Sequence, residues 1–163
     1  MAKRPLTPIR RHLRDDSTLH REVADNLQAL EASHRQCIDI TIRSSFADSL
    51  DLDGAFRVAY PQDNRWDYLL GLKQNPFVVG LEPHSAKDDE VSNVVEKCRA
   101  ARQQLRSHLR DGHEVQAWFW VASGSVKFAP TGKAVFRLSQ GGVTFVGTRL
   151  RAKHLAEVSG RRG

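Results

Sequence analysis

The chain has 163 residues, of which 40% are hydrophobic and 27% charged, and it carries a formal net charge of +6 with a pI of about 9.7. This length and composition are those of one globular domain that buries a core without disulfides or structural metals, and the positive charge suits an anionic partner such as nucleic acid. No apolar run approaches the ~18 residues of a membrane span, and the basic first residues lead into Pro5 and Pro8, so we expect neither a membrane span nor a signal peptide.

The two cysteines indicate the expected compartment. Cys37 and Cys98 show no close spacing, which excludes a disulfide framework and a zinc-binding pattern. Cys98 falls on the apolar stripe of a predicted helix, where a reduced, buried thiol is favoured. We therefore expect a cytoplasmic protein with no membrane partner, while the oligomeric state has no signature in the sequence.

Positive charge is concentrated at both ends of the chain. Residues 1–14 contain five basic side chains and no acidic one, and residues 149–163 contain five basic side chains against Glu157 alone. Such ends either contact the phosphates of a nucleic acid or are solvated. Arg10 and Arg11 are the candidates for phosphate contact.

The first third of the chain shows two periodic patterns and one ambiguous segment. Residues 1–16 carry prolines and charges without periodicity, which predicts a basic extended arm. Apolar residues recur at helical spacing over 17–35, and isoleucines alternate with polar residues over 38–42, so we expect a helix and then a strand. Residues 45–62 fit a short helix, which we favour, although an Asp-Gly pair within them also fits a turn between two short strands.

Two apolar runs in the middle of the chain each deliver one carboxylate. Residues 66–72 contain Asp67, residues 77–82 end in Glu82, and both runs are predicted strands. The polar turn at 73–76 folds the second strand back beside the first, so the two carboxylates converge. They either form a metal site or only end two strands.

The second half of the chain begins with the clearest predicted element. Residues 86–110 show one apolar stripe and an arginine-rich opposite face, which predicts a long helix. A strand at 115–122, an edge strand at 126–128, a small helix at 130–140 and a last strand at 143–146 are expected to follow.

This order of elements predicts the fold class. A helix that joins two central strands packs back across the sheet, so we expect an α/β fold with a mixed β-sheet flanked by helices. We expect a single α/β domain over residues 17–150 and a basic tail over residues 151–163.

Over residues 17–122, the order of elements and the two acids resemble the PD-(D/E)XK nuclease superfamily, the restriction-endonuclease-like fold. In that family an Asp and a Glu or Asp hold one or two divalent metal ions, and a lysine two residues beyond the second acid helps to activate the attacking water. Asp67 matches the first acid and Glu82 the second, within Glu82-Pro83-His84. Two departures are plain: no proline precedes Asp67, and His84 stands where the lysine is expected.

The resemblance implies a Mg²⁺ site, with Mn²⁺ as an alternative ion. Asp67 and Glu82 would hold the ion, and many members add an acid from the first helix, for which Glu22 is the candidate. Magnesium takes oxygen ligands and keeps several waters, so one or two carboxylates and a substrate phosphate suffice. The water-activating role is open between His84 and Lys87, which lies one turn into the next helix.

The neighbouring residues have structural explanations as well as functional ones. Ser85 is a good N-cap for the long helix, and the same helix N-terminus can seat a phosphate. The arginines of the exposed helix face, Arg99, Arg102 and Arg106, either are solvated or contact nucleic acid. The tryptophans of the strand at 115–122 point to one side, where they either fill a core or stack on bases.

Two functions are therefore expected from the sequence. The first is a metal-dependent phosphodiesterase or nuclease-fold protein that acts on nucleic acid. The alternative is a non-catalytic module that binds nucleic acid or protein on a degenerate nuclease fold. Cleavage and salt-sensitive binding without cleavage distinguish them.

Overall fold

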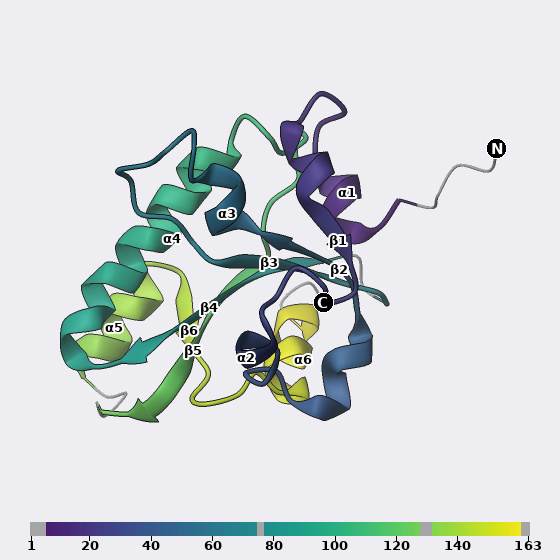
Figure 1. The fold of residues 1–163 in the computed structure, drawn as a ribbon. Coiled ribbons are helices and arrows are strands. Elements are labelled where there is room, and N and C mark those ends of the chain that lie inside the picture. Colours follow the sequence, from purple (N-terminus) through teal and green to yellow (C-terminus); the bar gives the residue numbers. More distant parts are fainter. Residues whose placement is uncertain (1–5, 75–76, 128–131, 161–163) are drawn as a thin grey trace.

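The computed structural model of the chain describes residues 6–74, 77–127 and 132–160. Within these residues a six-stranded mixed sheet is flanked by helices, which confirms the predicted α/β class (Figure 1). Strands β1 to β4 are antiparallel, and β5 and β6 run parallel to β4. In spatial and chain order the strands are β1 (Val23–Asp25), β2 (Phe46–Asp51), β3 (Tyr68–Leu72), β4 (Val78–Ala86), β5 (Ala117–Val126) and β6 (Val143–Phe145).

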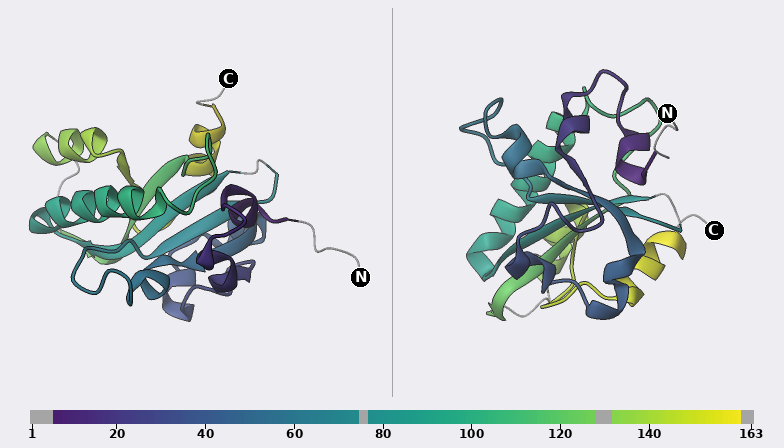
Figure 2. Two further views of the ribbon diagram at one scale, coloured as in Figure 1. Left: turned by 90° about the horizontal axis from the view of Figure 1, so that it is seen from above. Right: turned by 45° about the vertical axis from the view of Figure 1, so that its right-hand side comes forward.

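The helices are short, with one exception, α4. Helices α4 and α5 lie beside each other, as two views show (Figures 1 and 2). Among the helices described, none combines the length and apolarity that a bilayer crossing requires. The α-helices are α1 (Pro8–His12), α2 (Ala32–Arg35), α3 (Leu52–Phe56), α4 (Val91–Leu105), α5 (Lys133–Gln140) and α6 (Ala152–Gly160), and the 3-10 helices are η1 (Thr18–Glu22), η2 (Ile40–Ser45) and η3 (Asp88–Glu90).

Two hydrophobic cores lie on opposite faces of the sheet. The first packs α4 against the sheet and contains Trp118 and Trp120, whereas the second contains Phe119 from the same strand and Val158 from α6. This alternation confirms the predicted orientation of the aromatic residues on β5. Both tryptophans are buried, so they fill the core.

The predicted helix over residues 17–35 is wrong. The segment forms η1, the edge strand β1, a turn and α2, with Asn26 at a φ of 52° in that turn. Its apolar residues are spaced as in a helix, but Leu19 is buried in the first core and Leu27 in the second. The chain therefore passes around the edge of the sheet, and no single helix face could serve both cores.

The predicted strand over residues 38–42 is also wrong. Ile38 and Ile42 are buried, while Ile40 between them is 71% exposed. Asp39 caps the turn through its Oδ1, which accepts a hydrogen bond from Thr41 N at 2.9 Å. A spacing of four between buried residues with a capping Asp produces η2, and the strand begins afterwards, at Phe46.

The prediction of an extended arm over residues 1–16 is wrong for the segment that forms α1. Ile9 and Leu13, four residues apart, are buried in the first core. The carboxylate of Asp48 on β2 accepts a hydrogen bond from Ile9 N at 3.0 Å and fixes the start of the helix. At the other end, α6 occupies the predicted basic tail. The predicted bounds of the single α/β domain, residues 17–150, stay a prediction.

The central elements match the sequence more closely. The strands predicted at 66–72 and 77–82 are β3 and β4, and the long helix, the next strand, the small helix and the last strand correspond to α4, β5, α5 and β6. The segment 45–62 holds α3, preceded by β2. Ser85 is not an N-cap, because β4 continues to Ala86. The predicted edge strand at 126–128 is the end of β5 up to Val126, and residue 128 lies outside the described residues.

Candidate active site around Glu82

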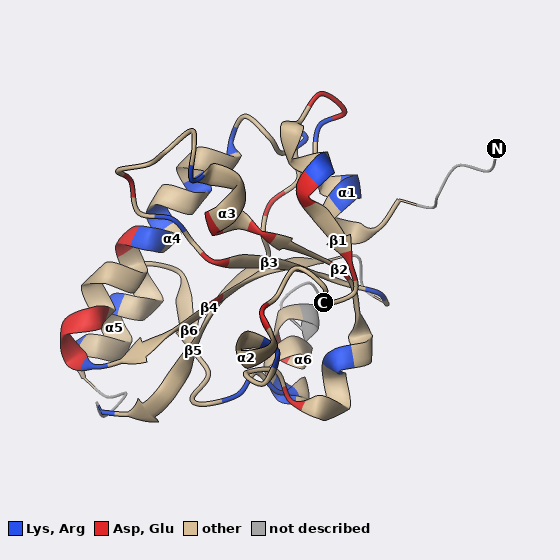
Figure 3. Cartoon of the chain, viewed as in Figure 1, with Lys and Arg blue, Asp and Glu red and all other residues tan. Residues whose placement is uncertain are grey.

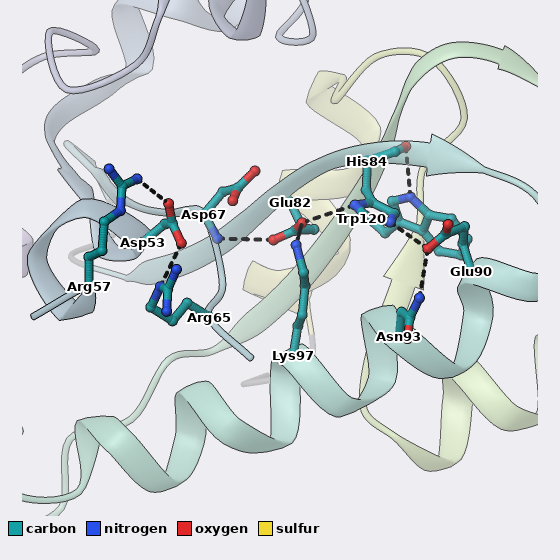
Figure 4. A network of polar contacts seen from close by, with 10 residues as sticks. All are labelled: Asp53, Arg57, Arg65, Asp67, Glu82, His84, Glu90, Asn93, Lys97 and Trp120. Carbon is teal, nitrogen blue, oxygen red and sulfur yellow. Dashed lines mark hydrogen bonds and ion pairs between the residues drawn. The ribbon is translucent and has the colours of Figure 1, made fainter. Parts of the chain in front are cut away.

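Glu82 lies at the centre of a polar network on β4 (Figure 4). Its side chain has no exposed surface. Oε1 accepts a hydrogen bond from Asp67 N at 2.9 Å, and Oε2 accepts one from the Nζ of Lys97 at 2.7 Å. A buried carboxylate is tolerated only when it is paired and hydrogen-bonded, and both oxygens of Glu82 meet that condition.

The hairpin of β3 and β4 positions Asp67 beside Glu82. Tyr68 pairs with Leu81 in the antiparallel register, so the next residues outward, Asp67 and Glu82, lie opposite each other. The carbonyl oxygen of Asp67 accepts hydrogen bonds from Leu52 N at 2.8 Å and Asp53 N at 3.3 Å. These bonds fix the backbone of Asp67 between β4 and the start of α3. The two acidic residues thus lie next to each other, joined through the backbone N of Asp67 and the carboxylate of Glu82.

Asp67 holds its proton far more tightly than an exposed aspartate. Burial and the negative charge of Glu82 raise the pKa of Asp67 from 3.8 to about 7, against the opposing effect of Lys97. The negative charge of Glu82 favours a proton or a cation on Asp67.

Lys97 is the residue that sequence reasoning missed. It projects from α4, which crosses the sheet between β4 and β5, and its side chain is 21% exposed. Burial disfavours its charge, but attraction to Glu82 and the hydrogen bond to it prevail and raise the pKa of Lys97. The available signal was its position beside Cys98 and three residues after Val94, at the border of the buried stripe. A lysine there reaches toward the sheet.

His84 connects the network to the beginning of α4. Its Nε2 lies 2.7 Å from Glu90 Oε2, and its Nδ1 lies 3.5 Å from Glu82 Oε2. The interaction with Glu82 raises the pKa of His84, burial opposes it, and the hydrogen bond to Glu90 adds to the rise. Trp120 Nε1 donates to the carbonyl oxygen of His84 at 3.1 Å. His84 therefore lies between two carboxylates that favour its protonated form.

Two arginines border the site on the side of α3. Asp53 accepts hydrogen bonds from Arg57 at 2.8 Å and from Arg65 Nε at 2.9 Å (Figure 4). Burial opposes the charge of Asp53, yet these two guanidinium groups lower its pKa. Asp53 is therefore a charged anchor for the residues that lead into Asp67.

Two of the predicted site residues lie elsewhere. Glu22 is exposed at the end of η1, next to β1, and β2 separates β1 from β3. Lys87 is exposed between β4 and η3, and the ammonium that contacts Glu82 is that of Lys97. The site therefore unites Asp67, Glu82 and His84, and leaves out Glu22 and Lys87.

The candidate arginines on α4 differ in their surroundings. Basic residues repeat along α4, and acidic ones gather at its N-terminal end (Figure 3). Arg99 is 78% exposed and lies 3.0 Å from Glu96. Arg102 donates to Gly141 O at 3.1 Å and lies over the Trp118 ring, whereas Arg106 is exposed. This helix keeps a positively charged outer face.

The candidate arginines on α1 differ in the same way. Arg10 donates to Val23 O at 3.1 Å and lies 3.4 Å from Asp25, so it ties α1 to β1. Arg11 is exposed on the same helix. Arg11 is the better placed of the two for phosphate.

The side chains present fit a small hard cation. Asp67 and Glu82 supply two carboxyl groups, and the negative charge of Glu82, which contributes to the raised pKa of Asp67, would be offset by a cation. No group of three or more His, Cys, Asp or Glu side chains with metal-binding geometry occurs among the described residues. Magnesium needs only one or two carboxylates when a substrate phosphate completes its shell.

Comparison with known proteins yields no relative. No protein-family model, no curated protein and no solved structure matches this chain.

Proposed function

We propose that this chain is a metal-dependent phosphodiesterase of the PD-(D/E)XK type that acts on nucleic acid. The observation that carries the proposal is that Glu82 accepts hydrogen bonds from the backbone N of Asp67 and from the Nζ of Lys97, which gathers two acidic residues of one hairpin and one ammonium from α4. The elements β3, β4, α4 and β5, with β5 parallel to β4, match the later part of the order on which the resemblance rests, whereas the helix over 17–35 and the strand over 38–42 that precede them in that order do not form. The restriction-endonuclease-like core belongs to this proposal.

Each residue has a defined task in such a site. Asp67 and Glu82 would hold Mg²⁺ or Mn²⁺, which when bound would stabilise charge on the phosphate and lower the pKa of a water. Lys97 keeps a positive charge beside Glu82 and orients the attacking water. His84 stands in the sequence position of the family's lysine, and its ring lies between Glu82 and Glu90 and connects them.

The position of Lys97 accounts for the departure from the family pattern. The family places its lysine two residues after the second acid, and His84 occupies that place here. Lys97 delivers the same charge to the same carboxylate from α4, one element later in the chain. We therefore assign the water-activating role to Lys97, in place of His84 and Lys87, the two candidates from the sequence. Free, buried Cys37 and Cys98 fit a cytoplasmic location for this reaction.

The test is cleavage of labelled single-stranded DNA, duplex DNA and RNA with Mg²⁺, with Mn²⁺ and with a chelator. Asp67→Asn, Glu82→Gln and Lys97→Met should each abolish metal-dependent cleavage, because each removes one of the three charges. Lys87→Met is the matched control, since Lys87 is an exposed lysine outside the network, and it should cleave like the wild type. Circular dichroism shows whether each variant is folded. Equal cleavage by wild type and the folded Asp67→Asn variant would disprove the catalytic role.

One observation favours the alternative, a non-catalytic binding module. Glu82 is completely buried, and both of its oxygens already accept hydrogen bonds. A carboxylate satisfied in this way also serves as a purely structural link between β4 and α4. The module predicts nucleic-acid binding that weakens with salt, no cleavage with either metal, and weaker binding when Arg106 and Arg11 are replaced by alanine.

A further inference from the structure

A polar groove lies between the loop that follows α3 and the side of α4 that faces this loop. Its volume is about 560 Å³, within the ~300–1,000 Å³ of small-molecule sites. The loop contributes Tyr60, Gln62, Asp63 and Asn64, and α4 contributes Glu96, Arg99, Ala100, Gln103 and Gln104. We call this site the carboxamide groove.

The charges of the carboxamide groove do not favour a phosphate. Arg99 lies 3.0 Å from Glu96, and Asp63 adds a second acid, so the acids outnumber the single cation. The remaining polar groups are the side-chain amides of three glutamines and one asparagine. Amides offer donors and acceptors in pairs, which suits an uncharged ring with both kinds of group on its edge.

Gln104 forms a buried polar wall of the groove. It is 5% exposed, and its Nε2 donates to Asn64 O at 3.1 Å. That carbonyl accepts only, so it fixes which end of the amide is the nitrogen. The other end, Oε1, is buried and has no hydrogen-bond partner among the described residues. Since Oε1 is buried, a donor on a ligand in the groove reaches it only when the Gln104 side chain turns toward the groove.

Tyr60 gives the groove an aromatic side. Its ring is half-buried and meets the buried Phe56 edge to face, with 5.4 Å between the ring centroids. The carbonyl oxygen of Tyr60 accepts a hydrogen bond from Arg65 at 2.7 Å. A ring held in this way offers a stacking surface with little loss of entropy on binding.

The carboxamide groove and the candidate active site are built from the same two segments. Asn64 precedes Asp67 by three residues, and Glu96 is the neighbour of Lys97. Arg65 joins the two sites, because it binds Tyr60 O on the groove side and Asp53 on the other. If a nucleic-acid strand places one phosphate at Asp67, we expect the adjacent nucleotide to reach the groove.

We propose that the carboxamide groove binds an unpaired nucleobase of the substrate, next to the phosphodiester at Asp67, so that the substrate class is single-stranded nucleic acid. The inference rests on the proposed function. The amides read the hydrogen-bonding edge of the base, and Tyr60 stacks on its face. In a duplex, this edge of the base is hydrogen-bonded to the partner base, so we expect duplexes not to enter the groove.

The test is an abasic scan with the full chain carrying Asp67→Asn, which prevents cleavage. Affinity is measured by fluorescence anisotropy for a labelled single-stranded oligonucleotide, for its duplex, and for versions that lack one base at each position in turn. We expect the duplex to bind at least ~10-fold more weakly, and one abasic position to weaken binding about tenfold. DNA and RNA versions distinguish the two sugars.

The groove is identified by a second set of variants. Replacing both Gln62 and Gln103, which are exposed, by alanine should weaken binding of the intact strand and remove the effect of the critical abasic position. Gln140→Ala is the matched control, because Gln140 is an exposed glutamine outside the groove, and it should leave the scan unchanged. An equal affinity for all abasic strands, or a scan that the double variant does not alter, overturns the inference.

The outcome separates this inference from the proposed function. Cleavage by the chain with Asp67 intact, together with a flat abasic scan, supports the nuclease and overturns the base site. A groove-dependent abasic position without any cleavage supports the base site and overturns the nuclease.

Discussion

The ammonium of Lys97 lies 2.7 Å from Oε2 of Glu82, a side chain with no exposed surface at all. Neither charge is stable alone in that position. The carboxylate is buried in the sheet and needs a cation, while burial disfavours the lysine's own charge and Glu82 restores it. The pair thus connects β4 with α4 and places a positive charge where the proposed chemistry needs one.

This coupling predicts an asymmetry between single and double variants. Lys97→Met leaves Glu82 buried without its cation and should cost about 3–5 kcal/mol of folding stability. Adding Glu82→Gln removes the uncompensated charge, so the double variant should recover ~1–3 kcal/mol relative to Lys97→Met. Chemical denaturation of the wild type, the two single variants and the double variant measures the interaction energy. Additive losses would contradict the coupling.

A second prediction concerns the stability of the chain as a function of pH. The pKa of Asp67 is about 7 in the folded chain, above its ordinary value of 3.8. Between these values the folded chain keeps a proton that the unfolded chain releases, so stability is highest below the ordinary pKa and falls as the pH rises to about 7. The Asp67→Asn variant has no carboxyl group at this position, so its stability lacks this pH dependence.

The pH prediction is measured against that variant. Between pH 4 and pH 7 the wild type should lose ~1–2 kcal/mol more than Asp67→Asn, a figure reduced for partial solvent screening. Urea denaturation across this range gives the difference, and neighbouring groups that titrate in both proteins largely cancel. Parallel curves for the two proteins would show that Asp67 titrates normally. Mg²⁺ should shrink the difference if it binds at Asp67, because a cation favours the charged carboxylate.

The sequence predicts the hairpin of the site because that part of the fold is local. Two apolar runs and a short polar turn specify β3 and β4, and their pairing alone brings Asp67 to Glu82. Lys97 is not predicted, since its contact depends on how α4 docks on the sheet, and the family pattern directs attention to His84 and Lys87 instead. The packing of α4 on the sheet, more than the residue type, decides which lysine contacts Glu82.

The first part of the chain is mispredicted for a related reason. Leu19 and Leu27 lie at a spacing typical of a helix, but they belong to different cores. Hydrophobic periodicity predicts which residues are buried, but it does not predict which face of the sheet they pack against. A segment that passes around a sheet edge can therefore imitate a helix.

Gly80 gives a third prediction. A Cβ at this position would lie 2.5 Å from Cε3 of Trp118 and 2.9 Å from Nε1 of Trp66. The two indoles meet edge to face at 5.1 Å and are buried, so neither ring has space to move. Gly80→Ala should cost about 1–3 kcal/mol in thermal or chemical denaturation.

The same substitution should reduce metal-dependent cleavage, because Trp66 immediately precedes Asp67 and its displacement moves the carboxylate. Gly124→Ala is the control, since no atom lies within 4 Å of its added Cβ. Unchanged stability of Gly80→Ala would mean that the two indoles move apart at little cost in free energy.

The last prediction separates packing from nucleic-acid contact on α1. Ile9 is 1% exposed in the first core, and its neighbour two residues on, Arg11, is exposed. Ile9→Ala should cost about 2–5 kcal/mol, while Arg11→Ala should change stability by less than ~0.5 kcal/mol. Deleting residues 1–14 would remove Ile9 together with the basic side chains, so weaker binding by such a truncation would report on unfolding as much as on charge. Arg11→Ala avoids that confusion.

If Arg11 contacts a phosphate, this variant binds single-stranded nucleic acid more weakly, and the slope of log affinity against log salt falls by about one. An unchanged slope at unchanged stability would assign Arg11 to the solvated surface.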